Sequence, residues 1–291
     1  MYPPKSRYIL DIAIPSTFTS QVKHGILKTY LIGQLARAVS IFRVRKIVIY
    51  LTKNTKSERK NQRIIELILR YLITPQYLRR KVFPKMAVLK YVGILPPLQT
   101  PNHPTITNIE KIFDEFREGI IVKETQDYLF IDVGLEDPVI VRKHKRRIKN
   151  KIVVVHLKRK GSELKGTIVK SEKVPYYFKY DILSFKGTLR ELLQKSYKEY
   201  DLVIGTSRFG NPLEEVENQL FKELKKRRRI LIVFGGPKEG LLDIGATKED
   251  FDYFINTIPD QGVRTIRTEE AVFATLSIFN YLIERSNNKK M

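Results

Sequence analysis

The segment DLVIGTSRFGNP (201–212) decides the fold, because its short apolar run ends in a turn that contains two glycines. ILIVFGGPKEG (230–240) and YFINTIPDQGVRT (253–265) repeat this arrangement. In open α/β sheets, ligands bind outside the carboxyl ends of the strands, and glycine lets the backbone approach a ligand closely. The three segments therefore predict parallel strands whose turns form one pocket.

These turns favour a nucleoside-like ligand. Gly205 and Gly210 have the spacing of a phosphate-binding loop, but Asn211 and Pro212 follow where that loop needs Lys and Ser or Thr. The first strand is not followed by the Gly-x-Gly-x-x-Gly fingerprint of dinucleotide sites. Backbone amides, hydroxyls and apolar side chains remain, and they suit a nucleoside better than a triphosphate. The alternative is that each turn is an ordinary tight turn without a ligand.

Strands and helices alternate on both sides of these turns. Strands are predicted at 8–14, 46–51, 201–204, 230–234 and 253–257, and helices at 22–42, 57–73, 189–197, 213–226 and 268–281. In the first helix, one face carries Leu27, Leu31, Leu35, Ala38 and Phe42. The alternation predicts an α/β fold with a parallel sheet covered on both faces.

The pattern changes between residues 118 and 174, where short strands follow one another closely. Strands are predicted at 119–123, 128–133, 138–142, 152–157 and 166–170. Five short strands in this length indicate a small OB-like β-barrel. We therefore expect a discontinuous α/β domain, residues 1–115 and 176–291, interrupted by a barrel at 116–175.

The net charge indicates a polyanionic partner. The 291 residues include 54 Lys and Arg against 31 Asp and Glu, which gives a formal net charge of +23. Nucleic acid is the first expectation and an anionic membrane the second, whereas a merely heat-adapted surface would have nearly balanced charge. The absence of cysteine excludes disulfides, thiolate metal sites and cysteine nucleophiles. No apolar run approaches the roughly 20 residues that span a bilayer, so we expect a soluble cytoplasmic protein without membrane contact.

Seven segments carry a resemblance to a known family. They are IAIPSTF (12–18), LKTYLIGQLARAVSIFRVRKIVIY (27–50), TPQYLRRKVFP (74–84), KYVGILPPLQTPNHP (90–104), DLVIGTSRFG (201–210), VFGGPKEGL (233–241) and NTIPDQGVRTIRTEEA (256–271). On these segments the chain resembles the SPOUT (α/β-knot) RNA methyltransferases. More narrowly, it resembles their archaeal and eukaryotic branch with an OB-like insertion, which includes uridine-N3 methyltransferases of ribosomal RNA. The last segment is the most specific of the seven.

The resemblance implies S-adenosylmethionine as cofactor, a C-terminal trefoil knot, and a homodimer with its active site at or near the two-fold interface. Transferred by motif position, the cofactor contacts are Thr206, Ser207, Arg208, Gly235, Gly240, Asn256, Thr257, Ile258, Pro259 and Thr265. The first turn departs from the family pattern. Relatives often read Thr-Ser-Glu-Arg-Gly, whereas this chain reads TSRFG at 206–210. The arginine is therefore displaced by one position and the acidic residue is missing.

Arg37 is the candidate catalytic residue. Methyl transfer to uridine N3 needs precise positioning of the reactants and loss of the N3 proton. Arg37 lies on the first long helix in line with Tyr30, Gln34 and Ile41, apart from the leucine stripe. Its guanidinium would stabilise an anion on uridine O2 or O4. The alternative is a structural arginine paired with a carboxylate.

Basic clusters in the predicted barrel indicate phosphate contacts with RNA. The candidates are Arg142, Lys143, Lys145, Arg146, Arg147, Lys149, Lys158 and Arg159. The alternative is a solvated charged loop. The four histidines (His24, His103, His144 and His156) lack metal-ligand spacing, so no metal is predicted.

Together these features predict an S-adenosylmethionine-dependent methyltransferase that acts on a base of ribosomal RNA, with uridine N3 as the expected atom. Two alternatives stay open. One is an RNA-binding or ribosome-assembly protein without methyl transfer, which the altered turn at Arg208 and Phe209 favours. The other is a tRNA methyltransferase, which basic charge does not distinguish.

Overall fold

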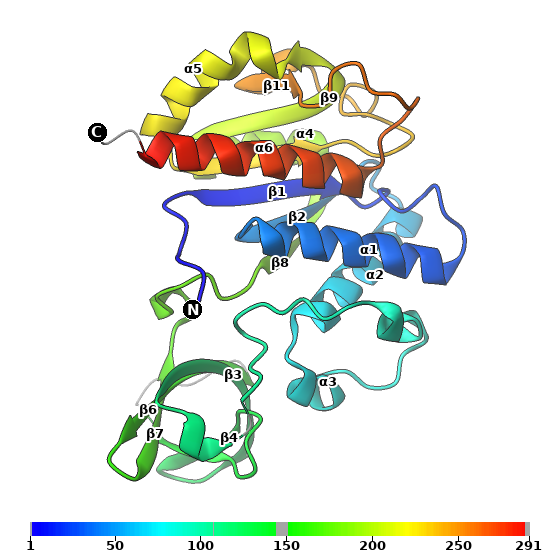
Figure 1. The fold of residues 1–291 in the computed structure, drawn as a ribbon. Coiled ribbons are helices and arrows are strands. Elements are labelled where there is room, and N and C mark those ends of the chain that lie inside the picture. Colours follow the sequence, from blue (N-terminus) through cyan, green and yellow to red (C-terminus); the bar gives the residue numbers. More distant parts are fainter. Residues whose placement is uncertain (1, 107, 144–150, 289–291) are drawn as a thin grey trace. The chain divides into compact units, whose positions relative to one another are not determined.

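The computed structural model describes residues 2–106, 108–143 and 151–288 (Figure 1). The chain forms two compact units that alternate along the sequence. The barrel unit comprises Met1–Lys5, Ile73–Met86 and Leu98–Lys179. The sheet unit comprises Ser6–Leu72, Ala87–Pro97 and Tyr180–Met291.

A six-stranded parallel sheet forms the centre of the sheet unit. Its strands are β1 (Ile9–Pro15), β2 (Lys46–Leu51), β8 (Asp181–Thr188), β9 (Leu202–Pro212), β10 (Arg229–Phe234) and β11 (Tyr253–Asn256), in the order β11-β9-β10-β1-β2-β8. Ile12, Ile230 and Ile232 in the central strands have no exposed surface. Such apolar runs are typical of strands covered on both faces. The predicted parallel sheet is confirmed.

In the sheet unit, α6 (Thr268–Asn288) packs against two other helices, α1 (Gly25–Ile41) and α5 (Leu213–Lys226). Phe42, just after α1, meets Phe273 of α6 edge to face with ring centroids 5.3 Å apart. Leu31 and Leu35 of the predicted stripe are buried, but the buried stripe does not reach Leu27, which is 46% exposed in the first turn. A further helix, α2 (Lys56–Ile73), is tied to β2 by the Gln62 amide, which donates to the carbonyl of Ile49 at 2.6 Å.

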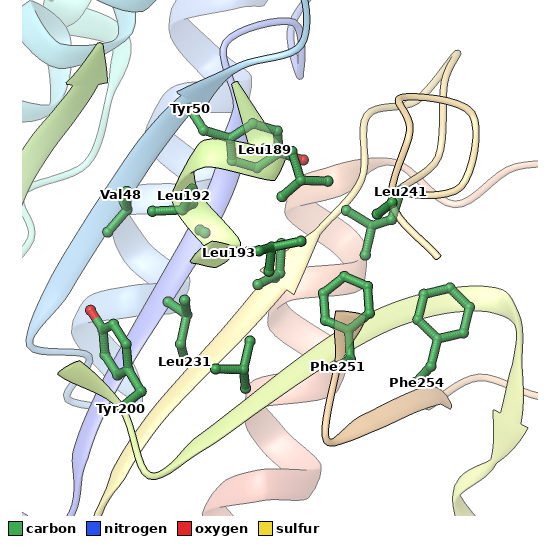
Figure 2. Close-up of a cluster of buried hydrophobic side chains, with 14 residues drawn as sticks. Val48, Tyr50, Leu189, Leu192, Leu193, Tyr200, Leu231, Leu241, Phe251 and Phe254 are labelled. Atoms are coloured by element: carbon green, nitrogen blue, oxygen red, sulfur yellow. The ribbon is translucent and has the colours of Figure 1, made fainter. Parts of the chain in front are cut away.

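An apolar core lies between the sheet and α4 (Leu189–Glu199), as Figure 2 shows. Its members are Ala13, Val48, Tyr50, Leu189, Leu192, Leu193, Tyr200, Val203, Leu231, Val233, Leu241, Ala246, Phe251 and Phe254. Successive strand side chains point to opposite faces, so Leu231 and Val233 enter this core while Ile232 between them points the other way. Leu241 and Phe251 anchor the segment after β10 in the same core. This anchoring matters for the cavity described below, because part of its wall comes from that segment.

β9 is longer than the sequence predicts. The expected strand ends at Ile204, but the ladder with β11 passes from the Gly205–Phe254 pair directly to the Asn211–Ile255 pair. Residues 206–210 therefore have no partner in β11 and form a bulge within β9. The prediction that the strand ends at Ile204 and is followed by a turn is wrong. Pairing with a strand much later in the chain is invisible in the local pattern. The sequence also gave no indication of β8 or of the short helix α3 (Gln76–Val82) in the barrel unit.

Five antiparallel strands form the core of the barrel unit. They are β3 (Asp114–Glu124), β4 (Tyr128–Asp132), β5 (Val139–Arg142), β6 (Ile152–Lys160) and β7 (Glu163–Val169), in the order β5-β4-β3-β6-β7. The outer strands β5 and β7 lie side by side without a hydrogen-bonded ladder, so the sheet is nearly closed. Ile131, Val155 and Leu157 fill its interior without exposed surface. The five predicted strands are confirmed, each with somewhat different ends.

Candidate functional site

A cavity of about 270 Å³ opens where β9, β10 and β11 end and α6 begins. All of its wall belongs to the sheet unit. The bulge of β9 forms one side, the turn after β10 a second, and the segment between β11 and α6 a third. The cavity thus lies at the edge of the parallel sheet where ligands of α/β proteins bind.

Nine of the ten predicted cofactor contacts line this cavity. They are Thr206, Ser207, Arg208, Gly235, Gly240, Asn256, Thr257, Ile258 and Thr265. Pro259, the tenth, is exposed and does not belong to the wall. The fold therefore brings together residues from three segments that are separate in the sequence.

Several wall residues were not identified from the sequence. Among them are Phe234 at the end of β10 and Thr268, Ala271 and Thr275 on α6. A signal for α6 was present, because Thr268 followed by two glutamates is typical of a helix start. A helix that begins beside a pocket directs its partial positive charge and unpaired amides toward that end.

Threonine hydroxyls hold the walls of the cavity together. Thr206 Oγ1 donates to the carbonyl of Val233 at 3.0 Å, which joins the bulge of β9 to β10. Thr268 Oγ1 donates to the carbonyl of Gly235 at 3.1 Å, which joins α6 to the turn after β10. The hydroxyls of Thr257 and Thr275 lie 2.8 Å apart and join the segment after β11 to α6.

The backbone itself forms the wall at Gly235. A Cβ placed on Gly235 would lie 3.0 Å from Cα of Gly240 and 3.1 Å from the nitrogen of Leu241, closer than such contacts normally are. The turn is closed by the Gly236 amide, which donates to the carbonyl of Glu239 at 2.9 Å. The two glycines predicted as ligand contacts therefore allow two stretches of backbone to touch at the cavity.

The rim of the cavity is positively charged. Arg208, Lys238 and Arg264 are exposed and line it, and they outnumber the one carboxylate of the lining, Asp243, which accepts the Gly240 amide at 2.7 Å. Glu269 follows the cavity residue Thr268 and is buried, and burial raises the pKa of its carboxyl group. The mouth of the cavity therefore suits a ligand that brings negative charge.

Arg37 does not line this cavity. It lies on α1, where its side chain is half-buried and has partners within the chain. Tyr30 and Ile41, which the sequence places in line with it, are each 48% exposed. The predicted line of residues is thus a surface-facing part of α1, apart from the cavity of the same chain.

The basic candidates of the barrel unit have different surroundings. Lys145, Arg146, Arg147 and Lys149 lie outside the described residues. Arg142 is exposed, and Lys143 pairs with Glu124 at 2.5 Å. Lys158 is 58% exposed at its side chain, with Asp114 at 3.9 Å.

Arg159 is held by main-chain carbonyls within the barrel unit. Its guanidinium donates to the carbonyls of Ile112 and Ser162, each at 3.0 Å, and to that of Ile109. A guanidinium has five N–H donors, and three carbonyls in this geometry satisfy most of them. These contacts indicate a structural role for Arg159, unlike that of its neighbour Lys158.

His103 and His156 have ordinary structural partners. His156 stacks on Phe116 with ring centroids 4.2 Å apart, and His103 lies 3.0 Å from the carbonyl of Ile73. Within the described ranges, no three or more His, Cys, Asp or Glu side chains come together as a metal site would require. Nor does any helix in those ranges combine the length and apolar character needed to cross a bilayer.

Comparison with known proteins connects this cavity to a chemistry. A family model described as "Putative RNA methyltransferase" matches residues 10–279, which include every part of the cavity wall. The chain belongs to this RNA methyltransferase family. The 28S rRNA (uridine-N(3))-methyltransferases of Mus musculus and Homo sapiens are each 32% identical to this chain. Each alignment covers 93% of this chain, and it covers 75% of the mouse protein and 77% of the human protein. The Drosophila melanogaster protein of the same name is 30% identical, and the alignment covers 92% of this chain and 61% of the fly protein.

Among the solved structures to which this chain shows a partial likeness is one of a bacterial protein. It is described as a probable methylase family protein from Haemophilus influenzae Rd KW20 and aligns with 98% of this chain and 70% of its own. Its sequence identity of 12% and TM-score of 0.38 are too low to bear on the site. The family assignment therefore rests on the sequence relatives, and it makes this chain an RNA methyltransferase.

Proposed function

We propose that the methyltransferase transfers a methyl group from S-adenosylmethionine to N3 of a uridine in ribosomal RNA. The observation that carries the proposal is the convergence of nine predicted donor contacts on one cavity. The rodent, human and fly relatives named as 28S rRNA uridine-N3 methyltransferases support the choice of RNA and atom. The excess of 23 positive charges supports a polyanionic substrate.

The residues of the cavity fit S-adenosylmethionine. Phe234 and Ile258 provide apolar surface for a nucleoside base, and Gly235 and Gly240 contribute wall that carries no side chain. The bound donor supplies a methyl on a sulfonium: transfer breaks the S–C bond, forms an N3–C bond and releases the N3 proton. The task of the protein is to fix both reactants in line and to stabilise the charge on the uracil ring.

We assign the stabilising role to Arg37, acting on the cavity of a second copy. Arg37 does not line its own cavity, so a homodimer is needed to bring it to one. Exposed apolar residues on α1 and α6 support such a dimer, since Ile41 is 48%, Phe273 48% and Tyr281 62% exposed. Contiguous apolar surface marks protein interfaces, and α1 and α6, which carry these residues, pack side by side.

The finer fold assignment is part of the same proposal. We assign residues 1–115 and 176–291 to a SPOUT domain with a C-terminal trefoil knot, and 116–175 to an OB-like insert that binds RNA. The compact barrel unit is larger than this insert, because it also includes Ile73–Met86 and residues 98–115. The adjacency of β9, β10 and β11 around the cavity supports the first assignment. The nearly closed five-stranded barrel supports the second.

The outer face of the barrel supports RNA contact. Alternation along β4 and β5 buries Leu129 and Val141 and turns Tyr128, Ile140 and Arg142 outward, and Tyr128 pairs with Arg142 across the two strands. Tyr128 is 46% and Ile140 56% exposed. Aromatic rings beside cations are the surface on which single-stranded nucleic acid stacks.

The proposal is tested by identifying the methylated nucleoside. The purified chain is incubated with isotope-labelled S-adenosylmethionine and ribosomal RNA from cells that lack the gene, and the RNA is digested and separated by mass spectrometry. We expect label in 3-methyluridine. Label in another nucleoside would disprove the target atom, and label in tRNA but not in ribosomal RNA would disprove the substrate. Absence of both label and donor binding would disprove the cofactor assignment.

A further inference from the structure

Phe209 is an exposed aromatic residue at the mouth of the cavity. Its side chain is 61% exposed, and it lines the cavity together with the neighbouring Arg208. A single exposed phenylalanine is common on protein surfaces and by itself indicates nothing. A role for Phe209 depends on how rigidly the neighbouring backbone fixes its position and on how much of its ring is accessible.

The backbone on both sides of Phe209 is anchored. Its own amide donates to Ser207 Oγ at 3.2 Å. The next residue, Gly210, passes so close to β11 that a Cβ on it would lie 2.8 Å from Cα of Ile255. Only glycine fits this approach, and Asn211 then pairs with Ile255 in the ladder. The ring therefore projects from a bulge that is fixed at both ends.

Arg208 lies against the ring of Phe209 and is itself held. The guanidinium carbon of Arg208 is 4.6 Å from the centroid of Phe209, within the range of a cation–π contact. One guanidinium nitrogen donates to the carbonyl of Arg264 at 3.0 Å. Arg208 thus joins the bulge of β9 to the segment before α6, and its guanidinium packs against the ring of Phe209.

The cavity has other apolar surface for the methyl donor. Phe234 lines it and is 1% exposed, which is the environment of an enclosed ligand base. Phe209, at 61%, lies in the opposite environment, where its ring is accessible from solvent. Two aromatic rings of such different exposure in one cavity suit two different nucleobases.

We propose that Phe209, supported by Arg208, is the platform on which the acceptor uracil stacks before it receives the methyl group. This proposal rests on the proposed function and adds the residue that places the acceptor. A base modified by an enzyme must leave its own stack, and aromatic side chains replace the stacking it loses. The Arg208 guanidinium adds positive charge where the phosphate backbone or a uracil oxygen approaches. In the segment TSRFG at 206–210, the aromatic residue directly follows the arginine that supports it.

The test compares Phe209→Leu, which keeps apolar volume, with Phe209→Tyr, which restores an aromatic ring. Val263→Ala is the matched control, because Val263 is 57% exposed in the neighbouring segment but does not line the cavity. For Phe209→Leu we expect kcat/KM for RNA to fall about tenfold to a hundredfold, the equivalent of one lost base stack. Phe209→Tyr should recover most of this loss. Affinity for S-adenosylmethionine, measured by calorimetry, should stay unchanged in all three variants.

A second measurement does not depend on methyl transfer. A short oligouridylate containing 5-bromouridine is irradiated with the wild-type chain, and the crosslinked peptide is identified by mass spectrometry. We expect the adduct on the peptide that contains Phe209 and its loss in Phe209→Leu. An adduct confined to other peptides, or wild-type kcat/KM in Phe209→Leu, would overturn the platform. A matching loss of donor affinity would assign the ring to the donor instead.

These outcomes separate the two proposals. If the wild-type chain methylates no RNA but crosslinks at Phe209, the platform stands and the proposed reaction fails. If the wild-type chain methylates uridine but Phe209→Leu does so equally well, the reaction stands and the platform fails.

Discussion

The side-chain amide of Asn256 donates to the main-chain carbonyl of Arg208 at 3.2 Å. The other end of the same amide, Oδ1, accepts the main-chain amide of Ile258 at 2.9 Å. One side chain at the end of β11 therefore fixes both the bulge of β9 and the start of the segment that leads to α6. Both of these segments form walls of the cavity.

Replacing Asn256 by alanine should weaken binding of S-adenosylmethionine. Two hydrogen bonds at roughly 1 kcal/mol each correspond to a loss of affinity of about tenfold to thirtyfold if both serve to order the cavity. Calorimetric titration measures the loss. Asn256→Asp keeps the acceptor but not the donor and should lie between wild type and Asn256→Ala. Equal affinity in all three proteins would show that the amide does not organise the site.

Gly235→Ala should disturb the turn after β10 at the point where it touches Gly240. The added Cβ would meet backbone atoms at 3.0 and 3.1 Å, and backbone is harder to displace than the end of a side chain. Forcing an extra methyl group into such a place costs about 1–3 kcal/mol. We expect reduced donor affinity and a lower melting temperature. Gly262→Ala is the matched control, since its Cβ would have no atom within 4 Å, and it should behave as wild type.

The turns around the cavity could be predicted from the sequence more fully than the strand that forms one of its sides. The turns after β9, β10 and β11 follow from a local pattern, buried strands followed by glycine and polar residues, whereas the individual cofactor contacts were expected from the resemblance to the methyltransferase family. The bulged extension of β9 could not be predicted, because it depends on Asn211 pairing with Ile255, and a pairing partner leaves no trace in the neighbouring residues.

Arg159 illustrates the same limit in the barrel unit. In the sequence it is one cation in the cluster Lys158-Arg159-Lys160, indistinguishable from a phosphate contact. Its carbonyl partners at Ile109, Ile112 and Ser162 are set by the fold of the chain around it. Charge type is readable from sequence, but whether a charge is available to a ligand depends on contacts that only the folded chain makes.

Arg37→Ala should lower the rate of methyl transfer while leaving donor binding intact. Removing one group that stabilises a developing anion costs about a hundredfold or more in kcat. Arg37 does not line the cavity of its own chain, so donor affinity should not change. Single-turnover kinetics and calorimetry measure the two quantities. A large fall in melting temperature with no specific effect on the rate constant would identify Arg37 as structural.

Asp201 should make stability depend on pH in the acid range. The Arg229 guanidinium, whose nitrogen lies 2.7 Å from the carboxylate, together with backbone amides lowers the pKa of Asp201 from 3.8 to about 2. A lowered carboxyl pKa contributes stability above the unfolded value, and that contribution is lost as pH falls through the folded value. Asp201→Asn should therefore melt below wild type at pH 7, and the gap should close between about pH 4 and pH 2. Thermal unfolding across this range measures the gap, and a gap independent of pH would contradict the assignment.

Lys158 and Arg159 should separate RNA binding from stability. Lys158 is exposed and weakly paired, so Lys158→Ala should leave the melting temperature unchanged and weaken RNA binding for all sequences alike. Losing one phosphate contact should reduce the slope of log affinity against log salt by about 1. Arg159→Ala removes a donor from three carbonyls and should lower the melting temperature. Filter binding of ribosomal RNA at several salt concentrations and thermal unfolding test both variants, and an unchanged salt slope in Lys158→Ala would remove Lys158 from the RNA-binding surface.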